Sequence, residues 1–237
     1  MDQINLGDIV IDVELKDIKN VHLSVYPPKG RVRIAAPRRM TLDTIRIYAI
    51  SKLSWIKKQQ KKFQGQVREV PREFLTKEGH YYLGSRYLLK VIEHNAPPLI
   101  IVKHKTIEMR VRPDTDMAKR QSLMDEWYRT QLKELVPQII NKYEKIMGVT
   151  ISEFAIKKMK TKWGTCNREA KRIWLNLELA KKPFQCIEYI VVHEMVHLLE
   201  RNHNEKFITY LNRFLPEWRD LKNELNKLPV SHRNWGY

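Results

Sequence analysis

The chain has 237 residues, of which 43% are hydrophobic, and it carries a formal net charge of +17. This composition excludes a disordered protein, and the length suits one large domain or two small ones. Two cysteines, Cys166 and Cys186, do not make a disulfide framework. No apolar stretch is long enough to cross a bilayer, and the N-terminus does not resemble a signal peptide. We therefore expect a cytoplasmic protein without a membrane partner.

Residues 1–113 are expected to form a β-rich N-terminal region with one basic helix. The segments 21–25 and 31–36 alternate apolar and polar residues, and the sequence PPKG between them predicts a hairpin turn. Apolar residues at helical spacing then predict a helix that begins after Thr41, a plausible N-cap, and extends to Phe63. Further strands are expected in three segments, 80–93, 99–104 and 106–112.

Residues 114–237 are expected to form a second region with longer helices. The first helix should span 115–147 and end at Gly148, with Pro137 kinking or splitting it. One mostly apolar face of this helix is predicted to contain Met124, Trp127, Gln131, Leu135, Ile139 and Tyr143. Two strands, 152–166 and 172–179, should follow, joined by a turn. A helix should begin near Pro183, and a last helix, capped by Asn204, should be interrupted by Pro216. We see no internal repeat.

Positive charge is concentrated in the N-terminal part of the chain. From Lys29 to Lys62 there are eleven Lys or Arg residues against one acid, Asp43. Such an excess favours binding to phosphates, although a solvated basic face explains it equally well. The candidate nucleic-acid patch consists of Arg31, Arg33, Arg38, Arg39, Lys57, Lys58, Lys61 and Lys62.

The strongest motif is the stretch VVHEMVHLLERNHNEKF over 191–207. His193, Glu194 and His197 form an H-E-x-x-H pattern, in which residues i and i+4 share one face of a helix. Two imidazoles placed in this way can hold one Zn²⁺, and Glu194 can take the proton of a water that the metal activates. His203 supplies a third ligand, and three protein ligands are typical of a catalytic zinc, whereas a structural zinc usually has four. Three unrelated histidines are the alternative.

Glu200 competes with His203 for the place of third ligand. It lies seven residues after His193, so an unbroken helix would put it on the metal face. A stop at Arg201–Asn202 would instead let the chain turn and bring His203 to the metal from another direction. In that arrangement Glu200 would accept a hydrogen bond from the outer N–H of a ligand histidine.

Several other residues are weaker candidates. Tyr210 and His232 could each stabilise an oxyanion, and the sequence does not rank them. Cys166 could be a nucleophile, but no base is visibly paired with it. Packing of Trp163 in the core and a bend at Gly164 are the favoured explanations for the sequence around it.

Three motifs of the C-terminal half resemble those of the YgjP-like metallopeptidases, relatives of the SprT group with a zincin-like fold. They are KWGTC at 162–166, RIWLNLEL at 172–179 and HEMVHLLERNH at 193–203. The resemblance implies a zincin-like core with metal ligands at His193, His197 and His203 and a general base at Glu194. Thr165 replaces the serine of the family. The spacing also equals that of metzincins, but Glu200 stands where their glycine permits a sharp turn.

We therefore predict an α+β protein with a zincin-like catalytic domain, which binds one Zn²⁺ and hydrolyses peptide bonds in a peptide or protein substrate. A strand beside the active helix should bind extended substrate, either residues 172–179 or the hairpin partner of this strand. The alternative is a nucleic-acid-associated protein whose metal site is structural or vestigial. A protease recruited to DNA would combine the two.

Overall fold

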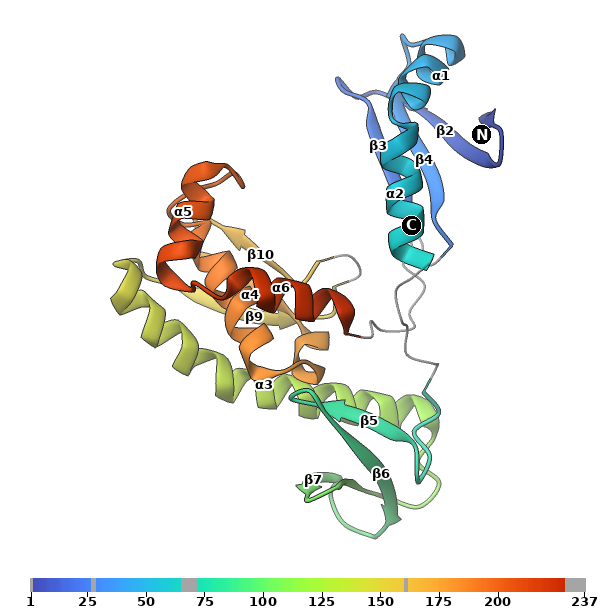
Figure 1. Ribbon diagram of the computed structural model, residues 1–237. Helices are drawn as coiled ribbons and strands as arrows, with labels where there is room; N and C mark the ends of the chain where they lie inside the picture. Colours follow the sequence, from blue (N-terminus) through green and yellow to red (C-terminus); the bar gives the residue numbers. More distant parts are fainter. Residues whose placement is uncertain (1, 27–28, 65–71, 160–161, 229–237) are drawn as a thin grey trace. The chain divides into compact units, whose positions relative to one another are not determined.

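The computed structural model describes residues 2–26, 29–64, 72–159 and 162–228, and the chain divides into two compact units between Glu69 and Val70 (Figure 1). We expected the division after residue 113, which lies further along the chain than the observed boundary. Residues 72–113 belong to the second unit because their buried side chains, such as Leu89 and Met109, share one hydrophobic core with those of the C-terminal helices. Among the described residues, no helix is both long and apolar enough to span a membrane.

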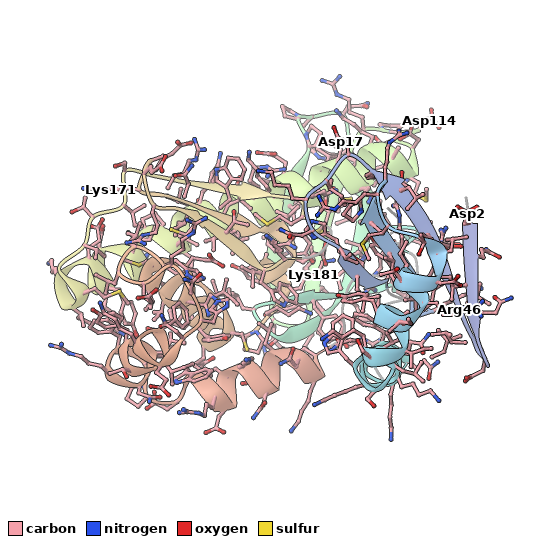
Figure 2. All side chains as sticks on the ribbon, turned by 90° about the horizontal axis from the view of Figure 1, so that it is seen from above. Asp2, Asp17, Arg46, Asp114, Lys171 and Lys181 are labelled. Carbon is pink, nitrogen blue, oxygen red and sulfur yellow. The ribbon has the colours of Figure 1, made fainter. Side chains whose placement is uncertain are left out.

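The first unit pairs a four-stranded sheet with two helices. Its elements are β1 (Asp2–Leu6), β2 (Ile9–Lys16), β3 (His22–Tyr26), β4 (Arg31–Pro37), α1 (Leu42–Ser51) and α2 (Leu53–Gln64), with strand order β1-β2-β4-β3. The predicted hairpin is confirmed, since β3 and β4 pair antiparallel. Thr41 caps α1 as expected, but the single predicted helix is two helices that meet at Lys52. Arg46 on α1 is exposed and is labelled in Figure 2.

The second unit begins with a sheet of the same design. Its strands are β5 (Gly79–Tyr82), β6 (Ser85–Glu93), β7 (Leu99–Lys103) and β8 (Thr106–Val111), in the order β5-β6-β8-β7. Each sheet has a parallel central pair flanked by two antiparallel edge strands. Each also turns between its first two strands at a Leu-Gly pair, with Gly7 and Gly84 at positive φ. This repeat of topology was not expected, because strand order is set by long-range pairing that apolar alternation does not reveal.

A long helix, α3 (Met117–Met147), follows this sheet. Asp116 accepts a hydrogen bond from the Lys119 amide at 2.7 Å, and Gly148 ends the helix in the left-handed conformation. Pro137 lies inside the helix without splitting it. The predicted apolar face of α3 was partly wrong. The buried face is wider than predicted, because α3 packs against several elements of the second unit. The members of this face are Met124, Tyr128, Leu132, Val136, Ile139, Ile140, Tyr143 and Met147.

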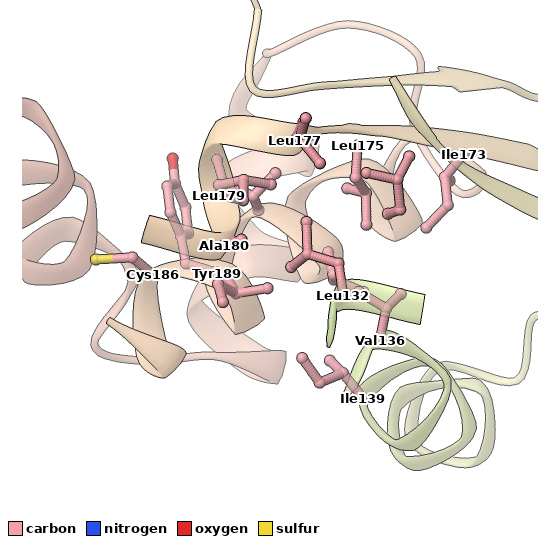
Figure 3. Close-up of a cluster of buried hydrophobic side chains, with 14 of the residues drawn as sticks. Leu132, Val136, Ile139, Ile173, Leu175, Leu177, Leu179, Ala180, Cys186 and Tyr189 are labelled. Carbon is pink, nitrogen blue, oxygen red and sulfur yellow. The ribbon is translucent and has the colours of Figure 1, made fainter. Parts of the chain in front are cut away.

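The C-terminal elements form the framework of the site. They are β9 (Glu153–Lys157), β10 (Gly164–Asn167), β11 (Arg172–Asn176), the short 3₁₀ helix η1 (Leu177–Lys181), α4 (Phe184–Val196), α5 (Glu205–Phe214) and α6 (Trp218–Lys227). The strands lie in the order β10-β11-β9, so β10 is an edge strand. The predicted turn between the two strands is confirmed, but the expected strand 152–166 is two strands, β9 and β10, and the expected strand 172–179 ends at Asn176, where η1 begins. Side chains of η1, α3 and α4 meet in the core beside this sheet (Figure 3).

Candidate metal centre

Three histidines converge where α4 ends. His193 lies in the last turn of the helix and His197 at its C-cap, and their ring centroids are 5.1 Å apart. The helix ends earlier than expected. Leu198 and Leu199 donate to carbonyls three residues back, at 3.0 and 2.9 Å, which tightens the last turn. The chain then returns, and the Nε2 atom of His203 lies 3.1 Å from that of His193.

The three histidines have the spacing of a metal ligand set. One nitrogen from each lies within 4.8 Å of the others. Two imidazole nitrogens bound to a tetrahedral zinc ion are separated by about 3.3 Å, given Zn–N bonds of about 2.0–2.1 Å. The 3.1 Å between His193 and His203 is close to that value. The residues present therefore fit a small divalent cation.

The surroundings of His193 and His197 favour the neutral imidazole, which is the form that binds metal. Burial and the neighbouring His197 and His203 lower the pKa of His193 to about 3. Burial also lowers the pKa of His197. The Nδ1 atom of His197 lies 3.2 Å from the carbonyl oxygen of Glu200 and donates to it, which leaves Nε2 free for a metal.

The ring of Phe207 packs against all three histidine rings. Its ring centroid lies 5.0 Å from that of His193, 4.8 Å from that of His197 and 4.7 Å from that of His203. Asn204 accepts a hydrogen bond from the Phe207 amide at 3.0 Å, so the predicted cap of α5 also fixes this ring. Phe207 was not predicted as a site residue, because nothing in local spacing shows that an aromatic ring lies under three histidines.

Glu194 is buried against the edge strand. Its side chain is 6% exposed, and burial raises its pKa to about 8, against the opposing effect of Lys162. A Cβ atom at Gly164 would lie 2.7 Å from both Cγ and Oε1 of Glu194. Gly164 was expected to permit a bend. In the structure its hydrogen side chain makes room for the carboxylate.

Glu200 contacts His197 through its backbone and not through its carboxylate. The carboxylate accepts a hydrogen bond from the Asn202 amide at 3.1 Å, and this bond lowers the pKa of Glu200. We expected the Glu200 side chain to accept a hydrogen bond from a histidine N–H. In the structure the backbone carbonyl oxygen of Glu200 accepts this bond from His197.

Asn176, which sequence reasoning missed as a site residue, holds the segment before β10. Its side-chain amide donates to the carbonyls of Met159 at 3.0 Å and Lys162 at 2.7 Å. Its side-chain oxygen accepts from the Glu178 amide at 3.2 Å, which caps η1. Asn176 is 1% exposed, so these bonds replace water that cannot reach it.

The histidines and Glu194 open into a cleft of about 1170 Å³, bounded by β10, α4 and α6. Tyr210 does not line it and stacks on Phe214, with 5.9 Å between ring centroids. His232, the other oxyanion candidate, lies outside the described residues. Tyr189 lines the cleft instead. Cys166 also lines it, but burial raises the pKa of this thiol to about 11, which disfavours a nucleophile.

The candidate nucleic-acid patch of the first unit is divided between two faces. Arg31 and Arg33 pair with Asp12 and Glu14 on the side of β4 opposite to the buried Val32 and Ile34. Arg38 and Arg39 follow β4 and are exposed, and Arg39 donates to the Lys19 carbonyl. Lys57, Lys58 and Lys61 are exposed on α2, whereas the side chain of Lys62 is outside the described part. Because α2 packs its buried Ile56 into the core of the sheet, its lysines lie away from Arg31 and Arg33.

This arrangement is that of a metal-dependent hydrolase, with a cluster of three histidines and a carboxylate in one cleft. The chain belongs to the YgjP-like metallopeptidase family, whose metallopeptidase domain matches residues 19–228. It is accordingly a metal-dependent peptidase.

Two solved structures are similar to part of the chain. One is the metallopeptidase zymogen abylysin of Pyrococcus abyssi, with 18% identity and a TM-score of 0.36 over 38% of this chain and 90% of that chain. The other is the metallopeptidase zymogen jannalysin of Methanocaldococcus jannaschii, with 23% identity and a TM-score of 0.33 over 40% of this chain and 92% of that chain. A search of curated proteins gave no match.

Proposed function

We propose that the chain is a zinc-dependent peptidase with a zincin-like core, in which His193, His197 and His203 hold one Zn²⁺. The observation that carries this proposal is the convergence of the three histidine nitrogens within 4.8 Å at the end of α4. Zinc bound there would lower the pKa of a water molecule and polarise the scissile carbonyl. The buried Phe207 ring packs against all three imidazoles and restricts their orientation.

Glu194 acts as the general base in this proposal. Its carboxylate is buried next to His193 and accessible from the cleft, where a reacting water would lie. Burial raises the pKa of Glu194, and the positive charge of a bound metal would counter this effect and favour the carboxylate form that can take a proton. Glu194 would then deliver the proton to the leaving amine.

The edge of β10 is the proposed binding place for extended substrate. Of the two strands that the sequence left open, β11 is paired on both sides, whereas β10 is paired with β11 alone among the described residues. An unpaired strand edge offers backbone donors and acceptors to an added strand. Gly164, at the start of β10, lies against Glu194, and this proximity supports the edge of β10 as the binding place.

The test is metal analysis combined with hydrolysis by the Glu194→Gln variant. Wild type should contain about one zinc per chain, and His193→Ala and His197→Ala should lose it. Glu194→Gln should keep the metal and lose turnover of a mixed pool of quenched fluorescent peptides, because an amide cannot serve as the base. Glu169→Gln, which changes another carboxylate lining the cleft, is the matched control and should retain turnover. Full zinc in both histidine variants, or unchanged turnover in Glu194→Gln, would overturn the proposal.

Weak, sequence-independent binding of nucleic acid by α2 is a second candidate function. The exposed Lys57, Lys58 and Lys61 form no ion pair within the described part of the chain, and Trp55 beside them is 44% exposed. Cations attract the phosphate backbone, and an exposed aromatic ring can stack on a base.

Titration of labelled single-stranded DNA at several salt concentrations tests this second function. Replacing the three lysines of α2 with glutamine should lower the slope of log affinity against log salt by about 2, since each phosphate contact in single strands contributes about 0.7. The control replaces three exposed lysines of α3, Lys119, Lys133 and Lys145, and should not change the slope. Binding that does not depend on salt would exclude the candidate.

A further inference from the structure

The cleft that holds the candidate metal site has strongly basic walls. Four cationic side chains line it, Lys162, Arg168, Arg201 and Lys222, against two carboxylates, Glu169 and Glu194. None of the four cations forms an ion pair with a carboxylate among the described residues. A bound metal would add two further positive charges. The cleft therefore presents a positive potential to whatever enters it.

The cations lie on both sides of the reacting centre. Gly164, in contact with Glu194, marks that centre on the strand side. Lys162 precedes it by two residues and Arg168 follows it by four, which corresponds to roughly 7 and 13 Å along an extended chain. The two residues therefore flank β10 along the chain, one before its first residue and one after its last.

The other two cations come from helical segments. Lys222 lies on α6, where its Nζ atom is 5.6 Å from the centroid of the Trp218 ring, and Arg201 follows the end of α4. Lys222 lines the cleft from α6, and Arg168 lines it directly after β10. Positive charge therefore reaches the centre from the strand side and from the helix side.

We propose that this cleft selects acidic peptide segments, with Lys162 and Arg168 as specificity-determining residues that engage carboxylates on either side of the scissile bond. The inference rests on the proposed peptidase function and names its substrate class. An extended peptide paired with β10 would present alternate side chains to the same wall of the cleft. Its carboxylates would meet cations that form no ion pair within the described part of the chain. Nucleic acid would also be attracted by these charges, but the unpaired backbone of β10 matches a peptide strand.

Binding is measured with the full-length Glu194→Gln variant, in zinc-loaded and metal-free forms, so that the probe is not cleaved. The probes are two short fluorescent peptides that differ only in glutamate or glutamine at the positions flanking the central bond. A pair of partly exposed opposite charges favours binding by a factor of about 5, so two engaged carboxylates should give roughly 25-fold tighter binding of the glutamate peptide at low salt. At about 1 M salt, where screening acts within roughly 3 Å, the preference should nearly vanish.

Charge variants assign the preference to the cleft. Lys162→Gln and Arg168→Gln should each reduce it about 5-fold. Lys133→Gln removes an exposed lysine of α3 that does not line the cleft, and it should leave the preference unchanged. Circular dichroism of each variant verifies that it is folded.

Three outcomes would overturn the inference. The first is equal binding of the glutamate and glutamine peptides at low salt, and the second is an equal loss of preference in Lys133→Gln. The third is a single-stranded oligonucleotide that binds more tightly than the glutamate peptide and depends on Lys162 and Arg168, which would assign the cleft to nucleic acid. Selective binding without any hydrolysis by wild type would overturn the peptidase proposal alone. Hydrolysis with charge-independent binding would overturn this inference alone.

Discussion

Alanine at position 164 should collide with the carboxylate of Glu194. The three atoms nearest to a Cβ built there all belong to Glu194, at 2.7, 2.7 and 2.9 Å. Ordinary contacts between such atoms lie at about 3.5–4.0 Å, so the overlap is about 1 Å. The helix α4 is largely buried and Gly164 is the buried residue of β10, so the Glu194 carboxylate has to move.

The expected change in stability follows from two opposing effects. Overpacking of this kind costs about 1–3 kcal/mol, whereas Gly→Ala at an unstrained position stabilises by about 0.4–1 kcal/mol through the unfolded chain. Gly164 does not have a positive φ, so its backbone accepts alanine and the cost is steric. Gly164→Ala should therefore lower the free energy of unfolding by about 1–2 kcal/mol. It should also reduce turnover about 100-fold, because a 1 Å displacement of a reacting group has that effect.

A double-mutant cycle with Glu194→Ala isolates the collision. Urea unfolding of wild type, both single variants and the double variant gives the coupling energy. Without the Glu194 carboxylate, Gly164→Ala should no longer destabilise and should become neutral or slightly stabilising. If Gly164→Ala costs the same in both backgrounds, Gly164 is not required by the approach of Glu194, and the reasoning fails.

Three further predictions concern the metal site, the core and a buried hydrogen-bond network. His203→Ala should weaken zinc binding far more than Glu200→Gln. The Glu200 variant should have little effect, because the Glu200 carbonyl and not its carboxylate contacts His197. Competition with a chelator measures the zinc affinity of both variants, and the reverse ranking would make Glu200 the ligand. His80, whose pKa burial and Arg72 lower to about 4, binds a proton more readily when unfolded. Protonation of His80 in the unfolded chain therefore lowers the free energy of unfolding as pH falls from about 6.5 toward 4, by about 2 kcal/mol between pH 7 and pH 5. Urea unfolding at both pH values should show this loss reduced in His80→Gln, and an identical loss there would contradict the assignment. Asn176→Ala should lower the free energy of unfolding by about 3 kcal/mol, because it leaves buried carbonyls without a hydrogen-bond donor. A loss below about 1 kcal/mol in thermal or urea unfolding would show that water replaces the amide.

Features that depend on residues close in the sequence were predictable. The H-E-x-x-H spacing places His193 and His197 on one face because the helix repeat is local. Caps at Thr41, Asn204 and Gly148 and the hairpin of β3 and β4 follow from the preferences of a few adjacent residues. The segment 80–93, expected as one strand segment, is instead the two paired strands β5 and β6. The approach of His203 also needed only a short turn after the helix, although the helix ends sooner than the sequence indicated.

Features that join distant segments were decided by the tertiary structure. Phe207 reaches the histidines only because α5 packs against α4, and the space left by Gly164 has meaning only once β10 lies against Glu194. The run of basic residues in the first unit is continuous in sequence but divided in space. Alternation along β4 turns Arg31 and Arg33 to the face opposite its buried residues, whereas α2 presents lysines elsewhere. Local spacing fixes the direction of a side chain within its own element, but which groups finally meet depends on how those elements pack together.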